Sequence, residues 1–192
     1  MKKELGIYWC ARDLDTITTP LGNHQFVLFI VDESTEIFPD DSPLKETDKD
    51  GNDYYFYTAS AGGEDSDPFD WNLLLMEING KPDVQSVREG LNPEKYVKIY
   101  KADYDIENHK IIDFSEANFA RIKSYLVNYS KNQKNKRVPN YDVTNLNCSS
   151  WVNTFFGALD VPYDTRRANW DFRGADLGEE SNFDPMYFTK LL

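Results

Sequence analysis

Runs of apolar residues along the first half of the chain predict strands, and the run 24–31 is nearly continuous, which indicates a strand buried on both faces or nearly so. The residues that favour strands are concentrated in five runs, 5–12, 24–31, 53–58, 73–78 and 96–100. A turn at 32–35 and a short strand at 36–38 are expected to pair back on the second run. The run at 73–78 leads into the turn Asn79-Gly80, with a short helix as its alternative.

Helical spacing appears in the second half. Residues 115–130 predict the most regular helix, with Ser115 as its cap and Phe114 and Phe119 at hydrophobic-staple positions. Its apolar face consists of Ile122, Tyr125, Leu126 and Tyr129. The basic segment 131–137 is expected to be a solvated connector, with a docking patch as the alternative.

A second helix is expected to begin at Cys148. Asn147 is a good N-cap, and Pro162 prevents continuation beyond residue 160. The apolar face of this helix consists of Trp151, Val152, Phe155, Phe156 and Leu159. Cys148 therefore lies in the first turn, where the helix dipole and unpaired N–H groups favour a thiolate. This is a common way to make a cysteine nucleophilic near neutral pH.

The segment around Cys148 resembles the Y-x-V-T-x-x-N-C-E-H-F-V-N segment of lecithin retinol acyltransferase-like proteins, which are circularly permuted relatives of NlpC-type papain-fold hydrolases. The matching residues are Tyr141, Val143, Thr144, Asn147, Cys148, Val152 and Asn153. The chain departs from the pattern where Ser149 and Ser150 replace Glu-His and Trp151 replaces Phe. The resemblance extends loosely to His24 and hardly at all to the rest of the chain.

The order of the predicted elements indicates an α+β fold with helices packed on an antiparallel sheet. The resemblance further implies a permuted papain-like (NlpC-type) fold, with an early catalytic His on a strand and a late Cys at the start of a helix. We expect one domain over residues 1–192, with an exposed acidic insertion near 39–52.

Acyl transfer by cysteine needs a thiolate, a base, a group that orients the base, and donors for the oxyanion. Cys148 is the predicted nucleophile, and His24, at the start of a strand, is the predicted base. His109 is the weaker alternative for the base. Glu36, twelve positions after His24, is the predicted orienting group, because related permuted hydrolases carry a His or Glu on the next strand. Failing Glu36, the strand 54–60 offers Thr58 and Ser60.

The oxyanion is expected to be bound by the backbone N–H of Cys148. Tyr141 resembles the family's tyrosine upstream of the nucleophile and is expected to line the substrate pocket, together with Asn147 and Ser149. Each assignment has a structural alternative: an inert buried cysteine, a surface histidine, and a tyrosine that only packs.

Two cysteines and two histidines form no zinc pattern or disulfide framework, so we expect no metal and no cofactor. Cys10, within an apolar run, is expected to be a small buried hydrophobe. No run predicts a signal peptide or a membrane anchor, so we expect a cytoplasmic protein when synthesised, exported if at all by a signal-independent route. A net charge of −12 disfavours nucleic acids and anionic membranes as partners.

These features predict a cysteine hydrolase that forms a thioester, acting on peptide or peptidoglycan amide bonds. A bacterial toxin or effector with a cognate inhibitor or immunity protein fits this profile by analogy of fold. One alternative is a lipid-directed thiol acyltransferase or esterase. The other is a non-catalytic acidic binding or immunity-type protein on the same scaffold.

Overall fold

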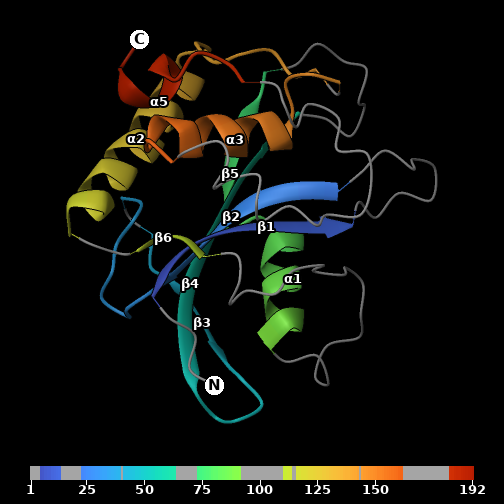
Figure 1. The fold of residues 1–192 in the computed structure, drawn as a ribbon, viewed down its shortest axis with the longest axis vertical. Coiled ribbons are helices and arrows are strands. Elements are labelled where there is room, and N and C mark those ends of the chain that lie inside the picture. Colours follow the sequence, from blue (N-terminus) through green and yellow to red (C-terminus); the bar gives the residue numbers. More distant parts are fainter. Residues whose placement is uncertain are drawn as a thin grey trace.

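An antiparallel sheet of six strands lies at the centre of the computed structural model (Figure 1). The model describes residues 5–13, 23–39, 41–63, 73–91, 110–113, 116–142, 144–161 and 182–192. The strands are β1 (Gly6–Asp13), β2 (Asn23–Val31), β3 (Leu44–Thr47), β4 (Asp53–Gly62), β5 (Leu75–Ile78) and β6 (Lys110–Asp113). Their order is β3-β4-β2-β1-β6, and β5 pairs with the end of β4.

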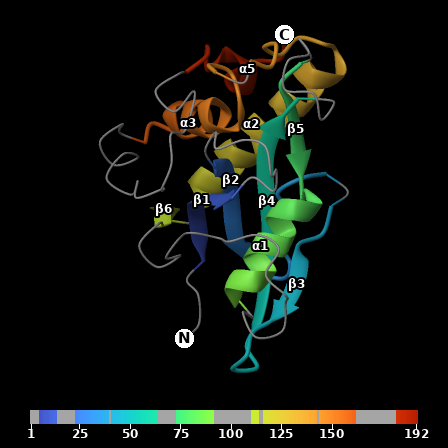
Figure 2. The same ribbon diagram turned by 90° about the vertical axis from the view of Figure 1, so that its right-hand side faces the viewer.

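The described helices cover both faces of this sheet. On one face α1 (Lys81–Leu91) lies along β3 and β4, which Figure 2 shows from the side. On the other face lie α2 (Glu116–Lys134), α3 (Cys148–Ala158) and the short α5 (Met186–Thr189). The observed class is therefore α+β, as the order of elements predicts.

Alternate residues of β2 pack into two separate hydrophobic cores, one on each face of the sheet. Phe26, Leu28 and Ile30 pack with Val84 and Val87 of α1. Their neighbours Val27, Phe29 and Val31 face α2, α3 and α5. Successive side chains of a strand point to opposite faces, so a strand covered on both sides must be apolar at every position. This explains the continuous apolar run in the sequence.

Aromatic contacts hold α3 against the sheet. Phe156 stacks on Trp9 of β1 with ring centroids 5.4 Å apart, and Phe155 meets Phe29 of β2 edge-on at 6.4 Å. All four side chains are at most 1% exposed. This packing fixes the position of α3 on β1 and β2, and so the position of its first residue.

The strands predicted at 5–12, 24–31, 53–58 and 73–78 correspond to β1, β2, β4 and β5, with β4 longer than expected. The predicted helix 115–130 corresponds to α2, which continues to Lys134. The connector expected at 131–137 is therefore wrong over its first part. Phe114, Ser115, His109 and the strand expected at 96–100 lie outside the described residues.

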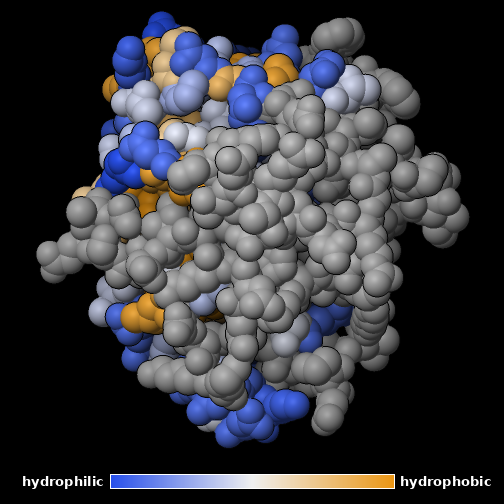
Figure 3. Space-filling view, in the orientation of Figure 1, coloured by the Kyte–Doolittle hydropathy of each residue, from blue (hydrophilic) through white to orange (hydrophobic). Residues whose placement is uncertain are grey.

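The expected strand at 36–38 is wrong, because the chain makes bends there rather than pairing back on β2. β3 lies within the predicted insertion 39–52. It pairs with β4 and forms this edge of the sheet. Glu46 of β3 is 7% exposed and lies 3.2 Å from Arg88 Nε of α1. The β3–β4 turn lies at the bottom of the molecule, where Figure 3 shows a hydrophilic surface. The insertion is thus partly sheet.

The helix α1 is not among the predicted elements, although its sequence carries a start signal. Pro82 and Asp83 occupy its first turn, where both residue types are favoured, and the apolar Val84 and Val87 follow. Among the described residues, no helix combines the length and apolar character needed to cross a membrane.

Candidate active site

The first turn of α3 presents Cys148 as the sequence predicts. Asn147 caps the helix: its side-chain oxygen accepts from the backbone N–H groups of Ser149 and Ser150 at 2.9 and 3.3 Å. The Ser150 hydroxyl accepts in return from the Asn147 backbone N–H at 2.8 Å. This capping box fixes the start of α3, with Cys148 as its first residue. Asn147 thus serves the site as a helix cap, and the hydroxyl of Ser150 completes the capping box.

His24, near the start of β2, joins Cys148 to the opposite face of the sheet. Its ring also lies close enough to the Cys148 side chain for each group to shift the pKa of the other. Its Nε2 lies 3.4 Å from Asp83 Oδ1, in the first turn of α1. The side chains of His24 and Asp83 are 13% and 3% exposed. The structure therefore brings Cys148 and His24 together and adds Asp83.

Asp83 occupies the place expected of an orienting group. Its Oδ2 accepts a hydrogen bond from the Ser60 hydroxyl at 2.7 Å. A carboxylate in the first turn of a helix is also stabilised by the helix dipole. In the sequence, Asp83 is marked only by its place in the first turn of α1, which begins directly after the turn Asn79-Gly80.

The contact between His24 and Asp83 is an ion-pair contact rather than a well-aligned hydrogen bond. Nε2 is buried, and its geometry to Asp83 does not satisfy hydrogen-bond criteria. A charge contact at this distance still favours the imidazolium strongly, because little water screens two groups in the interior.

Charges at the site favour a thiolate–imidazolium pair. Burial by itself lowers the pKa of His24, but the charges of Asp83 and of the Cys148 thiolate outweigh it and raise this pKa to about 10. Burial raises the pKa of Cys148, yet the charge and hydrogen bond of His24 bring it below the ordinary thiol value. A site with this electrostatic arrangement is suited to nucleophilic attack.

Two neighbours also act on the Cys148 thiolate as donors: the backbone N–H of Gln25 and the side chain of Ser149. Both lower the pKa of Cys148. The side chain of Gln25 is fully buried and accepts from Trp9 Nε1 at 2.9 Å, which ties the start of β2 to β1. Sequence reasoning did not find Gln25, because its contribution comes from the backbone.

Tyr141 is half-buried in the segment that leads into α3, near enough to Cys148 to be affected by its charge. Burial and the nearby Cys148 charge raise the pKa of Tyr141 to about 12, so its hydroxyl stays protonated. The segment is held by mutual backbone hydrogen bonds between Asp142 and Leu146, both 2.8 Å. Val143 lies outside the described residues.

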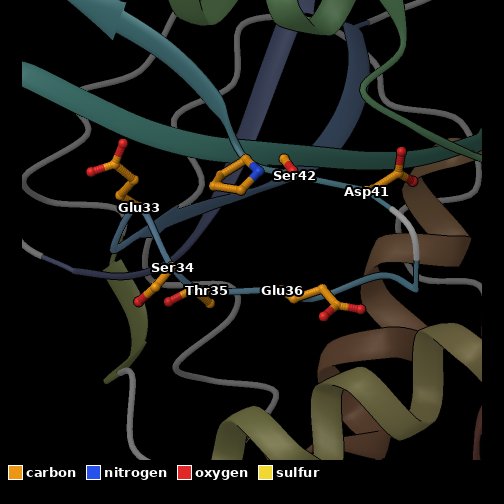
Figure 4. Close-up of a pocket in the computed structure, with 7 residues that line it drawn as sticks. Glu33, Ser34, Thr35, Glu36, Asp41 and Ser42 are labelled. Atoms are coloured by element: carbon orange, nitrogen blue, oxygen red, sulfur yellow. The ribbon is translucent and has the colours of Figure 1, made fainter.

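Glu36 does not reach His24, and its predicted role is wrong. It is exposed, and its Oε1 lies 3.6 Å from Lys123 Nζ of α2. It lines a hollow of about 420 Å³ formed by the segment between β2 and β3, together with Glu33, Ser34, Thr35, Asp41, Ser42 and Pro43 (Figure 4). The physical reason is the length of β2: His24 is at its beginning and Glu36 follows its end, a separation of roughly 20 Å along the strand.

Among the described residues, no group of three His, Cys, Asp or Glu side chains is arranged to hold a metal ion. Comparison of the chain with family models, curated proteins and solved structures finds no match. The function is therefore inferred from the geometry of Cys148, His24 and Asp83.

Proposed function

We propose that the protein is a cysteine hydrolase that forms a thioester through Cys148, on a permuted papain-like scaffold. The observation that supports it best is the alignment of three side chains across the sheet. A thiol at a capped helix N-terminus interacts with a largely buried imidazole, and a buried carboxylate lies 3.4 Å from Nε2 of that imidazole. This provides the nucleophile, base and orienting group that acyl transfer requires.

In the proposed reaction the Cys148 thiolate attacks the carbonyl carbon of an amide and forms a tetrahedral oxyanion. The His24 imidazolium then gives its proton to the leaving amine as the C–N bond breaks, leaving a thioester on Sγ. Because Nε2 faces Asp83, Nδ1 is the nitrogen we assign to this transfer. Water, deprotonated by neutral His24, next attacks the thioester, and the Cys148 thiolate leaves as the acid product forms.

We assign oxyanion stabilisation to the backbone N–H of Cys148, one of the N-terminal amides that a helix leaves without an intrahelical acceptor. Tyr141 is the proposed second donor, because it lies near Cys148 and its pKa of about 12 keeps the phenol protonated. We assign Ser149 to thiolate stabilisation rather than to the substrate pocket, because its side chain lowers the pKa of Cys148.

Among substrates we favour an amide bond in a peptide or peptidoglycan stem over a lipid ester. The chain carries a net charge of −12, which opposes approach to anionic bilayers. The choice of peptidoglycan, the role as a secreted effector and the existence of a cognate inhibitor rest on the resemblance of the Cys148 segment to the permuted NlpC-type family.

The test is digestion of purified peptidoglycan and synthetic stem peptides, with products identified by mass spectrometry. The wild-type protein should release cleaved peptides and Cys148→Ala should not, while phospholipid vesicles should yield no fatty acid from either. Vesicle hydrolysis that disappears in Cys148→Ala would favour the lipid esterase instead.

Thiol labelling separates the enzyme from a binding protein that has only kept the scaffold. Iodoacetamide at pH 7 should modify Cys148 much faster than the fully buried Cys10, because the thiolate fraction and access set the rate. Peptide mapping identifies the labelled residue. A Cys148 that reacts only after unfolding would contradict an active nucleophile.

A further inference from the structure

The hydroxyl of Ser60 contacts the oxygen of Asp83 that does not face His24. Ser60, near the end of β4, is 4% exposed, and its Oγ donates to Asp83 Oδ2 at 2.7 Å. Asp83, counted as a whole residue, is 2% exposed. The bond joins two buried groups, one on the sheet and one on α1. A hydrogen bond to a buried carboxylate is among the stronger ones in proteins.

The two oxygens of Asp83 are held differently. Oδ2 has the short bond from Ser60, whereas Oδ1 faces His24 at 3.4 Å without good alignment. The weaker contact cannot by itself fix the rotation of the carboxylate. The Ser60 bond restricts that rotation, so it helps to keep Oδ1 directed at Nε2.

We propose that Ser60 is a positioning residue that acts on the Cys148–His24 pair through Asp83, an inference that rests on the proposed function. Ser60 positions Asp83, Asp83 stabilises the His24 imidazolium, and the imidazolium stabilises the Cys148 thiolate. Ser60 carries no charge, so it stabilises the ionised carboxylate without competing with the imidazolium for it.

The backbone of Ser60 is well placed for this role. Ala59 pairs with Val27 of β2, and Ser60 pairs with Glu77 of β5, so β4 is held on both edges here. The exposed Glu77 is the charged neighbour on the same face, and its carboxylate lies against Gly80 before α1. A hydroxyl on a paired strand is fixed in position more firmly than one on a loop.

The chain offers a matched control in Ser86, three residues after Asp83 on α1. Ser86 is fully buried, and within the described residues its hydroxyl has no hydrogen-bond partner. Ser86→Ala therefore removes a buried hydroxyl from the same helix without touching Asp83. It should leave the chemistry of Cys148 unchanged.

The experiment is the rate of Cys148 alkylation by iodoacetamide as a function of pH, followed by peptide mapping. In Ser60→Ala the carboxylate is less well directed, the imidazolium is less stabilised, and the apparent pKa of Cys148 should rise. We expect the rate at pH 6 to fall about three- to tenfold. Ser86→Ala and Ser60→Thr, which keeps the hydroxyl, should retain the wild-type profile.

A double-mutant cycle tests the route through Asp83. If Ser60 acts only through that carboxylate, Ser60→Ala should lower the alkylation rate no further in an Asp83→Asn background. An unshifted profile in Ser60→Ala, an equal shift in Ser86→Ala, or additive effects in the cycle would each overturn the proposal.

Should Ser60→Ala fail to fold, the wild-type protein still provides a test. Its Ser60 hydroxyl proton should exchange slowly with water and show a nuclear Overhauser contact to the Asp83 β-protons. Absence of that signal would overturn the arrangement. The labelling readout needs no substrate, so a protein that cleaves no peptide but responds to Ser60→Ala would refute only the proposed hydrolase.

Discussion

Three residues far apart in the sequence form the candidate site, and each contributes a different property. Cys148 has a thiol in the field of a helix N-terminus, His24 has a largely buried imidazole, and Asp83 has a buried carboxylate. None of these would carry a functional argument alone. Burial alone would keep Cys148 and His24 neutral. With Asp83 beside His24, the thiolate and the imidazolium are the favoured forms.

Asp83→Asn should lower turnover by about 10²- to 10⁴-fold, because the orienting carboxylate that stabilises the imidazolium is removed. The same variant should raise the apparent pKa of Cys148 in alkylation. Glu36→Gln is the matched control, since Glu36 is an exposed partner of Lys123 and should leave turnover and alkylation as in the wild type. A strong effect of Glu36→Gln with a silent Asp83→Asn would reverse the assignment.

The pH dependence should differ between turnover and alkylation. Turnover needs the thiolate and the His24 proton together, so it should be bell-shaped between the lowered pKa of Cys148 and about pH 10. Both limits belong to the coupled pair. Alkylation needs only the thiolate, so its rate should rise on the acid side and not fall at high pH. A turnover profile that declines already near the ordinary histidine value of 6.5 would contradict the raised pKa of His24.

The same raised pKa affects folding. The folded protein holds the His24 proton more tightly than the unfolded chain does. This contribution to stability is fully present below the ordinary pKa of 6.5, and it is lost as the pH rises through about 10.

At the scale of elements, the site depends on two helix starts. The first turn of α3 supplies Cys148 and that of α1 supplies Asp83, from opposite faces of the sheet, with the start of β2 between them. A helix start is a fixed point only when its free N–H groups are satisfied. For α3 the capping box of Asn147 and Ser150 does this.

Asn147→Ala should lower the free energy of unfolding by about 1 kcal/mol, because two backbone N–H groups lose their acceptor. In a chain of this size we expect a fall in melting temperature of about 2–4 °C. Asn145→Ala is the control: it removes only exposed hydrogen bonds to Asp142 and Thr144 in the preceding turn, so its cost should be clearly smaller. Equal effects of the two variants would argue against a specific cap.

At the scale of the whole molecule, the last residues of the chain complete the core beneath α3. Phe188 of α5 is fully buried, stacks on Tyr129 at 4.8 Å and meets Trp151 edge-on at 5.4 Å. Asn132 of α2 donates to the carbonyls of Tyr187 and Lys190 at 3.0 and 2.8 Å. The end of the chain thus supports the helix that carries Cys148.

Phe188→Ala should destabilise the fold by about 3–5 kcal/mol, because it opens a cavity among these rings. Leu191→Ala provides the control: Leu191 is 60% exposed and its truncation should change stability little. Urea unfolding followed by tryptophan fluorescence measures both. A loss below 1 kcal/mol for Phe188→Ala would show that α5 is dispensable for the core.

The sequence by itself determined what depends on neighbours along the chain. The apolar runs of β1, β2 and β4, the helical spacing of α2 and α3, the cap at Asn147 and the place of Cys148 in a first turn all follow from local patterns. The α+β class follows from their order. The buried state of Cys10 follows from its apolar surroundings.

Only the tertiary structure decided which carboxylate faces His24. Position in the sequence favoured Glu36. However, His24 lies at the start of the long strand β2, whereas Glu36 follows its other end, where the chain bends away. Asp83 reaches the ring because α1 crosses the face of the sheet on which His24 and Ser60 lie. The pKa values of Cys148 and His24 depend on this same meeting, since burial and opposite charge act across space and not along the chain.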